Sequence, residues 1–140
     1  MTKILLPVDG SDFGAQALTQ WLQRVRPAAL ELHLLSVQLP VDGHARSFVS
    51  ADELNSYHRE EGLASMAAVR QVLDAAGVTY QQHVVVGHPA DVICRFASDN
   101  GFDEIVMGSH GRTGLMKLLM GSVAAEVSER ASVKVTLIAA

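Results

Sequence analysis

Apolar residues gather in five short runs along the chain, and stretches with helical periodicity separate these runs. A short apolar run bounded by turn residues is typical of a strand that is buried on both faces, as in a parallel sheet. The turn residues Asp9 and Gly10, for example, close the first run. The predicted strands are residues 4–8, 30–37, 78–86, 105–107 and 133–138.

Four stretches repeat apolar residues at the spacing of an amphipathic helix. The expected helices cover residues 12–25, 52–76, 89–100 and about 122–131. Ser11 can cap the first helix, Gly77 suits the end of the second, and Pro89 suits the start of the third. Trp21 lies one position off the apolar stripe and is expected to be partly exposed. The core-facing positions are expected to be Ala15, Leu18, Leu22, Val25, Leu63, Met66, Val69, Leu73, Ala76, Val92, Phe96 and Ala97.

The alternation of strands and helices predicts a doubly wound α/β fold. Its five-stranded parallel sheet would have right-handed crossovers and helices on both faces. The chain of 140 residues contains no linker or repeat, so we expect a single domain over residues 1–140. Residues 38–50 show no period and are expected to form the longest loop, and such loops are often functional.

The composition excludes several classes of protein. Eleven Lys and Arg against fifteen Asp and Glu give a net charge of −4, which disfavours nucleic-acid binding. The apolar run before Pro7 is too short for a signal peptide, and no stretch approaches the roughly 18 apolar residues of a membrane helix. The single cysteine, Cys94, excludes an intramolecular disulfide and is expected to pack within a helix. We therefore expect a soluble cytoplasmic protein with no nucleic-acid or membrane partner.

Glycines with a fixed spacing follow the fourth predicted strand. Two residues separate Gly108 from Gly111, and nine more separate Gly111 from Gly121–Ser122. Glycine permits positive φ and lets a ligand approach the backbone closely. We expect a helix to begin at Gly121–Ser122, where free N–H groups and the positive dipole end would bind an anion. Residues 105–125 contain basic side chains, Arg112 among them, but no Asp or Glu, which favours a polyphosphate.

The position of these glycines in the predicted fold also favours a ligand-binding role. In an open parallel sheet, ligands bind beyond the carboxyl ends of the strands, near the point where the strand order reverses. The loop that begins at Gly108 and the loop after the first strand, residues 7–11, should both lie there. The glycine spacing is neither a Walker A motif nor the dinucleotide fingerprint G-x-G-x-x-G.

Three blocks of the sequence resemble the universal stress protein family: residues 4–11, 87–90 and 103–112. The spacing from Gly108 to Ser122 is similar to the G-x2-G-x9-G-[S/T] pattern of the family's ATP-binding branch. The likeness covers essentially the whole chain. It implies the sheet order 3-2-1-4-5, with ATP lying across the ends of strands one, two and four.

The resemblance also implies which residues contact the nucleotide. The implied set is Pro7, Val8, Asp9, Val37, Met107, Gly108, Gly111, Arg112, Gly121, Ser122 and Val123. The glycines and Ser122 would hold the phosphates and ribose, the end of the first strand would flank adenine and ribose, and the backbone of Val37 would meet adenine. Mg²⁺ or Mn²⁺ bound with ATP would lie near Asp9. Taken alone, Asp9 could instead cap the next helix, and Arg112 could belong to a solvated face.

The resemblance implies a nucleotide-binding regulator of stress responses that forms a homodimer through its last strand. Lys134 stands where the family usually has proline, and Lys and Thr blunt an edge strand against pairing. Another dimer mode therefore stays open. ATP and other adenine nucleotides both fit, and a slow ATPase and a nucleotide-free dimeric interaction module are the alternative functions.

No residue stands out as catalytic, so we expect weak ATP hydrolysis at most. Ser109 and His110 are adjacent, which rarely allows a nucleophile–base pair, and Met107 stands where a nucleophile elbow needs glycine. Asp9 lacks the acidic neighbours that a phosphoacceptor aspartate would need to hold Mg²⁺. The six histidines show no metal-ligand spacing, and most are expected at the surface.

Overall fold

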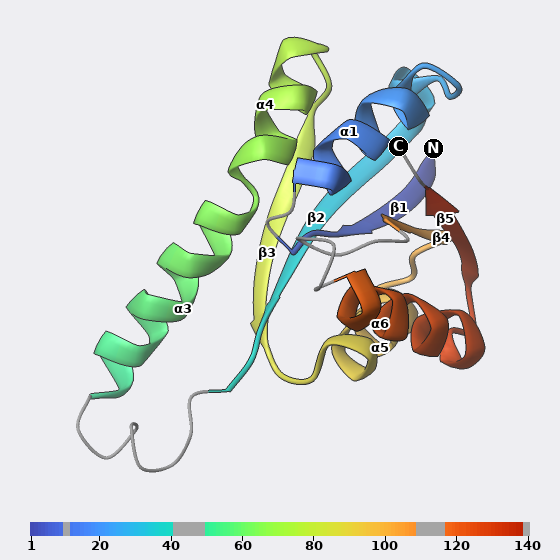
Figure 1. Ribbon diagram of the computed structural model, residues 1–140. Helices are drawn as coiled ribbons and strands as arrows, with labels where there is room; N and C mark the ends of the chain where they lie inside the picture. The colour runs from blue at the N-terminus through green and yellow to red at the C-terminus, as the bar shows by residue number, and fades with distance from the viewer. Residues whose placement is uncertain (10–11, 41–49, 109–116, 139–140) are drawn as a thin grey trace.

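The computed structural model describes residues 1–9, 12–40, 50–108 and 117–138, with the backbone alone at 12–14 and 117–121 (Figure 1). Its centre is a five-stranded sheet in the order β3-β2-β1-β4-β5, in which every neighbouring pair is parallel. This arrangement confirms the predicted fold class and strand order. The strands are β1 (Thr2–Pro7), β2 (Leu30–Gln38), β3 (Tyr80–Val86), β4 (Glu104–Gly108) and β5 (Lys134–Ile138).

Helices cover both faces of the sheet (Figure 1). They are α1 (Asp12–Leu22), the short 3-10 helix η1 (Pro27–Ala29), α3 (Ala51–Ser65), α4 (Ala67–Ala75), α5 (Pro89–Asp99) and α6 (Lys117–Arg130). The first core lies between the sheet and the layer of α1 and α4, with Ile4, Leu18, Leu34 and Leu73 among its members. The second core lies on the opposite face, beneath α5 and α6, and includes Leu5, Leu35, Ile93, Phe102, Met107 and Val127.

Several local signals in the sequence are confirmed. Gly77 and Gly101 follow helix ends with φ of +69° and +68°, a conformation that glycine adopts without a Cβ penalty. Pro89 opens α5, where its missing N–H costs nothing, and Asp91 lies in the first turn. The two cores take alternate residues of the same central strands, such as Leu34 and Leu35 of β2, which is why apolar residues run consecutively in these strands.

Three expectations about the first two predicted helices are wrong. Trp21 is only 6% exposed and belongs to the first core, because α1 packs against both the sheet and α4 and so buries a wider stripe. The helix expected over 52–76 is two helices that meet at Met66, whose φ of −92° and ψ of −4° depart from helical geometry. Ser50 caps the N-terminus of α3, where its hydroxyl accepts a hydrogen bond from the Glu53 N–H at 3.1 Å. Ala76, expected in the core, is exposed.

Within the described part of the chain, none of the helices combines the length and apolar character that crossing a membrane requires.

Candidate functional site

The carboxyl ends of β2, β1 and β4 lie side by side, with β1 in the middle. The N–H of Val8 donates a hydrogen bond to the Leu35 carbonyl at 2.9 Å, which holds the end of β1 against β2. On the other side Leu5 pairs with Ile105, so continuing the register brings Val8 level with Gly108. The chain leaves β1 toward one layer of helices and β4 toward the other, which makes this the strand-reversal point where ligands bind in such sheets.

The residues implied at the ends of β1 and β2 lie together at this edge. Pro7, Val8, Asp9 and Val37 are all half-buried. Val8 packs against the first core and Val37 against the second, so the edge is supported from both faces of the sheet. The ends of β1 and β2 are therefore held in place from both faces of the sheet.

Met107 and Gly108 complete β4, and they differ in what they can offer a ligand. The Met107 side chain is 1% exposed and fills the second core, so it is not available to a ligand. Gly108, the last residue of β4, is half-buried and pairs with Ile138 of β5. Gly111 and Arg112, like the rest of 109–116, lie outside the described residues, as does most of the long loop expected over 38–50.

The expectation that a helix begins at Gly121–Ser122 is wrong. Helix α6 begins at Lys117, so Gly121 lies in its second turn and its N–H falls within the range of intrahelical bonding. Lys117, Leu118, Leu119 and Met120 are all strong helix formers, and together they outweigh the roughly 1 kcal/mol cost of one helical glycine. Ser122 is exposed on this helix, and Val123 packs against the second core. The free N–H groups of this helix therefore belong to the turn before Gly121.

A small polar cluster beside Val8 had no signal in the sequence. The Ser65 hydroxyl donates to the Gly62 carbonyl at 2.7 Å and lies 3.0 Å from the Ser36 hydroxyl. The Gln38 amide donates to the same Ser36 oxygen at 3.1 Å. Ser36 is almost fully buried, so these bonds satisfy a hydroxyl that would otherwise be costly in the core.

Of the four histidines that the structure describes, two are buried, His83 is half-buried and His88 is exposed. His44 and His110 lie outside the described residues, so the expectation that most of the six are at the surface stays a prediction. His33 and His58 are each 5% exposed. His33 Nε2 lies 2.7 Å from a Glu31 carboxylate oxygen, and His33 Nδ1 lies 2.8 Å from His83 Nε2. A carboxylate can only accept, so His33 donates to Glu31 and, when neutral, accepts the N–H of His83. Burial and the nearby His33 lower the pKa of His83, and the hydrogen bond from His33 lowers the pKa of Glu31.

Metal and thiol chemistry find little support in the described residues. Among them, no group of three or more His, Cys, Asp or Glu side chains could hold a metal ion. Burial raises the pKa of the Cys94 thiol, which packs against the second core, as expected for a structural cysteine. A metal at Asp9 would therefore need ligands from a bound phosphate or from the adjoining loops.

Known proteins share both the sequence pattern and the fold of this chain. Residues 1–139 match the Universal stress protein family. The chain is 30% identical to universal stress protein MJ0531 of Methanocaldococcus jannaschii, over 97% of its own length and 81% of that protein. It superposes on the solved structure of MJ0577, from the same organism, with a TM-score of 0.76, 32% identity, and coverage of 98% of this chain and 94% of that one. A universal stress protein solved in complex with cAMP aligns with a TM-score of 0.66 and 27% identity, covering 97% of this chain and 95% of the other.

Proposed function

The chain belongs to the universal stress protein family, and on that premise we propose that the carboxyl edge of its sheet binds ATP and that binding regulates a stress response in the cytoplasm. The observation that carries the proposal is the meeting of Val8, Asp9, Val37 and Gly108 at the strand-reversal point. A similar protein has been solved with cAMP, which supports an adenine nucleotide as the ligand class.

The spacing of small residues favours a ligand with several phosphates. Gly108, Gly111, Gly121 and Ser122 lie in a stretch free of Asp and Glu, so no carboxylate there would repel a triphosphate. We place the phosphates beside the first turn of α6, because unbonded N–H groups and the positive end of the helix dipole favour anions. Arg112 would add a cation to the same side.

Asp9 is our proposed contact for a divalent cation bound with ATP. Mg²⁺ in nucleotide sites usually takes one or two carboxylates and completes its shell with phosphate oxygens and water. Replacing Asp9 with Asn should therefore reduce the gain in ATP affinity that Mg²⁺ provides. If affinity falls equally with and without Mg²⁺, Asp9 contacts the ribose or the backbone and the metal role is wrong.

We propose a homodimer in which β5 forms the contact. The side chain of Leu137 on this edge strand is 45% exposed, which is unusual for a leucine of a central sheet and would be covered by a partner strand. Lys134 at the strand's start is exposed and would limit how far pairing extends.

Equilibrium dialysis against radiolabelled ATP, with and without Mg²⁺, tests the proposed function. We expect saturable one-to-one binding below millimolar ATP, with competition by other adenine nucleotides and weak competition by CTP. Turnover measured in the same samples should be slow beside the rate of nucleotide exchange. The proposal is wrong if millimolar ATP with Mg²⁺ or Mn²⁺ leaves the protein unliganded.

A further inference from the structure

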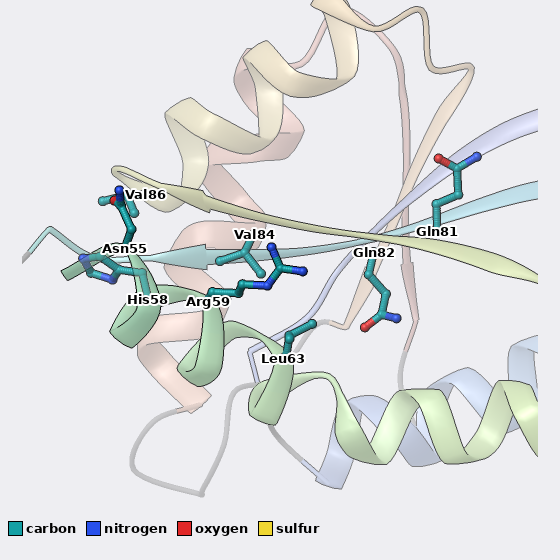
Figure 2. A pocket seen from close by; sticks show the side chains of 8 residues that line it. All are labelled: Asn55, His58, Arg59, Leu63, Gln81, Gln82, Val84 and Val86. Carbon is teal, nitrogen blue, oxygen red and sulfur yellow. The ribbon is translucent and has the colours of Figure 1, made fainter. Parts of the chain in front are cut away.

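A groove of about 670 Å³ lies between α3 and β3 (Figure 2). β3 is an edge strand of the sheet, and β2 separates it from β1. Asn55, His58, Arg59 and Leu63 enter the groove from one face of α3, at the i, i+3, i+4 and i+8 spacing of neighbouring helical turns. The strand supplies the opposite wall through Gln82, Val84 and Val86, among others. We refer to it as the α3–β3 groove.

A single close contact explains why the groove exists. Gly62 packs so tightly on β3 that a Cβ added there would come within 2.6 Å of both Val84 methyl groups. The glycine lets α3 touch the strand at this point. Toward its N-terminus α3 leans away from β3 (Figure 1), and the groove lies between the two elements.

The wall formed by β3 presents backbone groups as well as side chains. The Gly87 N–H donates to the Gln38 carbonyl at 2.9 Å, so Gly87 turns its backbone toward β2. In a parallel ladder alternate residues face the same neighbour, so Gln82, Val84 and Val86 turn their N–H and C=O groups outward. β3 is the last strand on its side, and no described segment pairs with these groups. Its sequence offers no proline or charge that would blunt the edge.

The side chains that α3 contributes to the groove favour a ligand with a carboxylate. Among the described residues that line the groove, none is acidic, and Arg59 is cationic and exposed. His58 is 5% exposed, and its Nδ1 makes no hydrogen bond within the described part of the chain. A buried ring nitrogen without a partner is costly, and a ligand would recover that cost by bonding to it after a turn of the His58 ring, because the atom is enclosed in this structure.

We propose that the α3–β3 groove binds an extended segment of a partner protein, which adds to β3 as a further strand and places an Asp or Glu side chain against Arg59 and His58. Outward backbone groups at alternate residues match an extended peptide, and Leu63, Val84 and Val86 provide apolar contacts between them. A second copy of β3 would fit less well, because β3 contains no acidic residue to meet Arg59. The groove is separate from the proposed nucleotide site, so each can be tested without the other.

A phage-displayed library of random dodecapeptides, selected against the immobilised full chain, supplies the probes. We expect the enriched sequences to combine β-branched or aromatic residues with Asp or Glu, and synthetic copies to bind in a fluorescence anisotropy assay. Arg59→Gln should weaken that binding at least fivefold, and added salt should reduce the difference. Arg24→Gln, at an exposed arginine of the loop that follows α1, is the matched control and should leave binding unchanged.

A proline scan of β3 tests the backbone pairing itself. Gln82→Pro removes an outward N–H, which an edge strand tolerates, so the fold and ATP binding should persist while peptide affinity falls at least tenfold. Val86→Pro, at a second outward position, should act alike and guards against a local effect at residue 82. Absence of enriched peptides, or peptides that bind both proline variants normally, overturns the proposal. So does a dimer, seen by sedimentation velocity, that Gln82→Pro dissociates.

Discussion

The two ends of the parallel sheet are built from different side chains. At the amino end, Lys3 of β1 is tied to the segment between α5 and β4: its Nζ donates to the Asn100 carbonyl at 2.6 Å, and its backbone N–H donates to the Asp103 carboxylate at 2.8 Å. The Lys3 ammonium also lies 4.6 Å from the centre of the Phe102 ring. At the carboxyl ends of β1 and β4, by contrast, Val8 and Gly108 are half-buried and have no long polar side chain.

This difference separates stability from binding. The hydrogen bonds and packed side chains of the amino end contribute to the free energy of unfolding. The smaller residues of the carboxyl end leave backbone groups accessible to a ligand. Changes at the amino end should therefore alter stability and spare ATP affinity, and changes at the carboxyl end should do the reverse.

The largest effect is expected from Phe102→Ala. Phe102 is buried in the second core and makes an edge-to-face contact with the His33 ring, with centroids 4.9 Å apart. Truncation should lower the free energy of unfolding by about 3–5 kcal/mol, the usual cost of removing a buried phenyl group. Urea denaturation measures this loss. At temperatures where the variant is folded, ATP affinity should stay within about twofold of the parent; a larger fall would show that the two ends are coupled.

Gly121→Ala should have the opposite outcome. Alanine is favoured over glycine within a helix by about 1 kcal/mol, so the melting temperature should hold or rise. If phosphates approach the backbone here, the added methyl group should weaken ATP binding about tenfold, or ~1.4 kcal/mol. Calorimetric titration and thermal melts on the same sample separate the two effects. Unchanged ATP affinity would remove Gly121 from the site.

A smaller effect is expected on the stability of the fold as the pH is lowered. Because the pKa of His83 is lowered in the folded state, the unfolded chain binds this proton more readily. His83 therefore contributes stability that is complete above the unfolded pKa of about 6.5 and is lost as pH falls through the folded value. Glu31, also lowered, acts in the same direction at lower pH. Melting curves between pH 7.5 and 5.5 should show a shallower loss for His83→Gln. The exposed His88, replaced by Gln, is the control, and equal slopes in both variants would contradict the account.

Most of the fold follows from local patterns. The β-branched and aliphatic runs, the glycines after helix ends and the proline at the start of α5 act through backbone preferences that neighbouring residues alone determine. The glycine pattern predicts the start of α6 too late, because several weak helix preferences add over Lys117 to Met120 and outweigh the cost of Gly121.

Contacts between distant parts of the chain could not be predicted in the same way. His33 and His83 are 50 residues apart, and they meet only because β2 and β3 pair in a particular register. The groove beside Gly62 likewise depends on how closely α3 approaches β3, which no periodicity encodes. Of the implied nucleotide contacts, Gly111 and Arg112 lie outside the described residues and stay predictions.

The most direct test of the central claim is an amide NMR titration of ¹⁵N-labelled protein with ATP and Mg²⁺. The account predicts chemical-shift changes at Val8, Asp9, Val37, Gly108 and Ser122, with the amides of Lys3, His33 and Asp103 at the other end of the sheet unaffected. Shifts concentrated at the amino end, or a spectrum unchanged at saturating ATP, would contradict it.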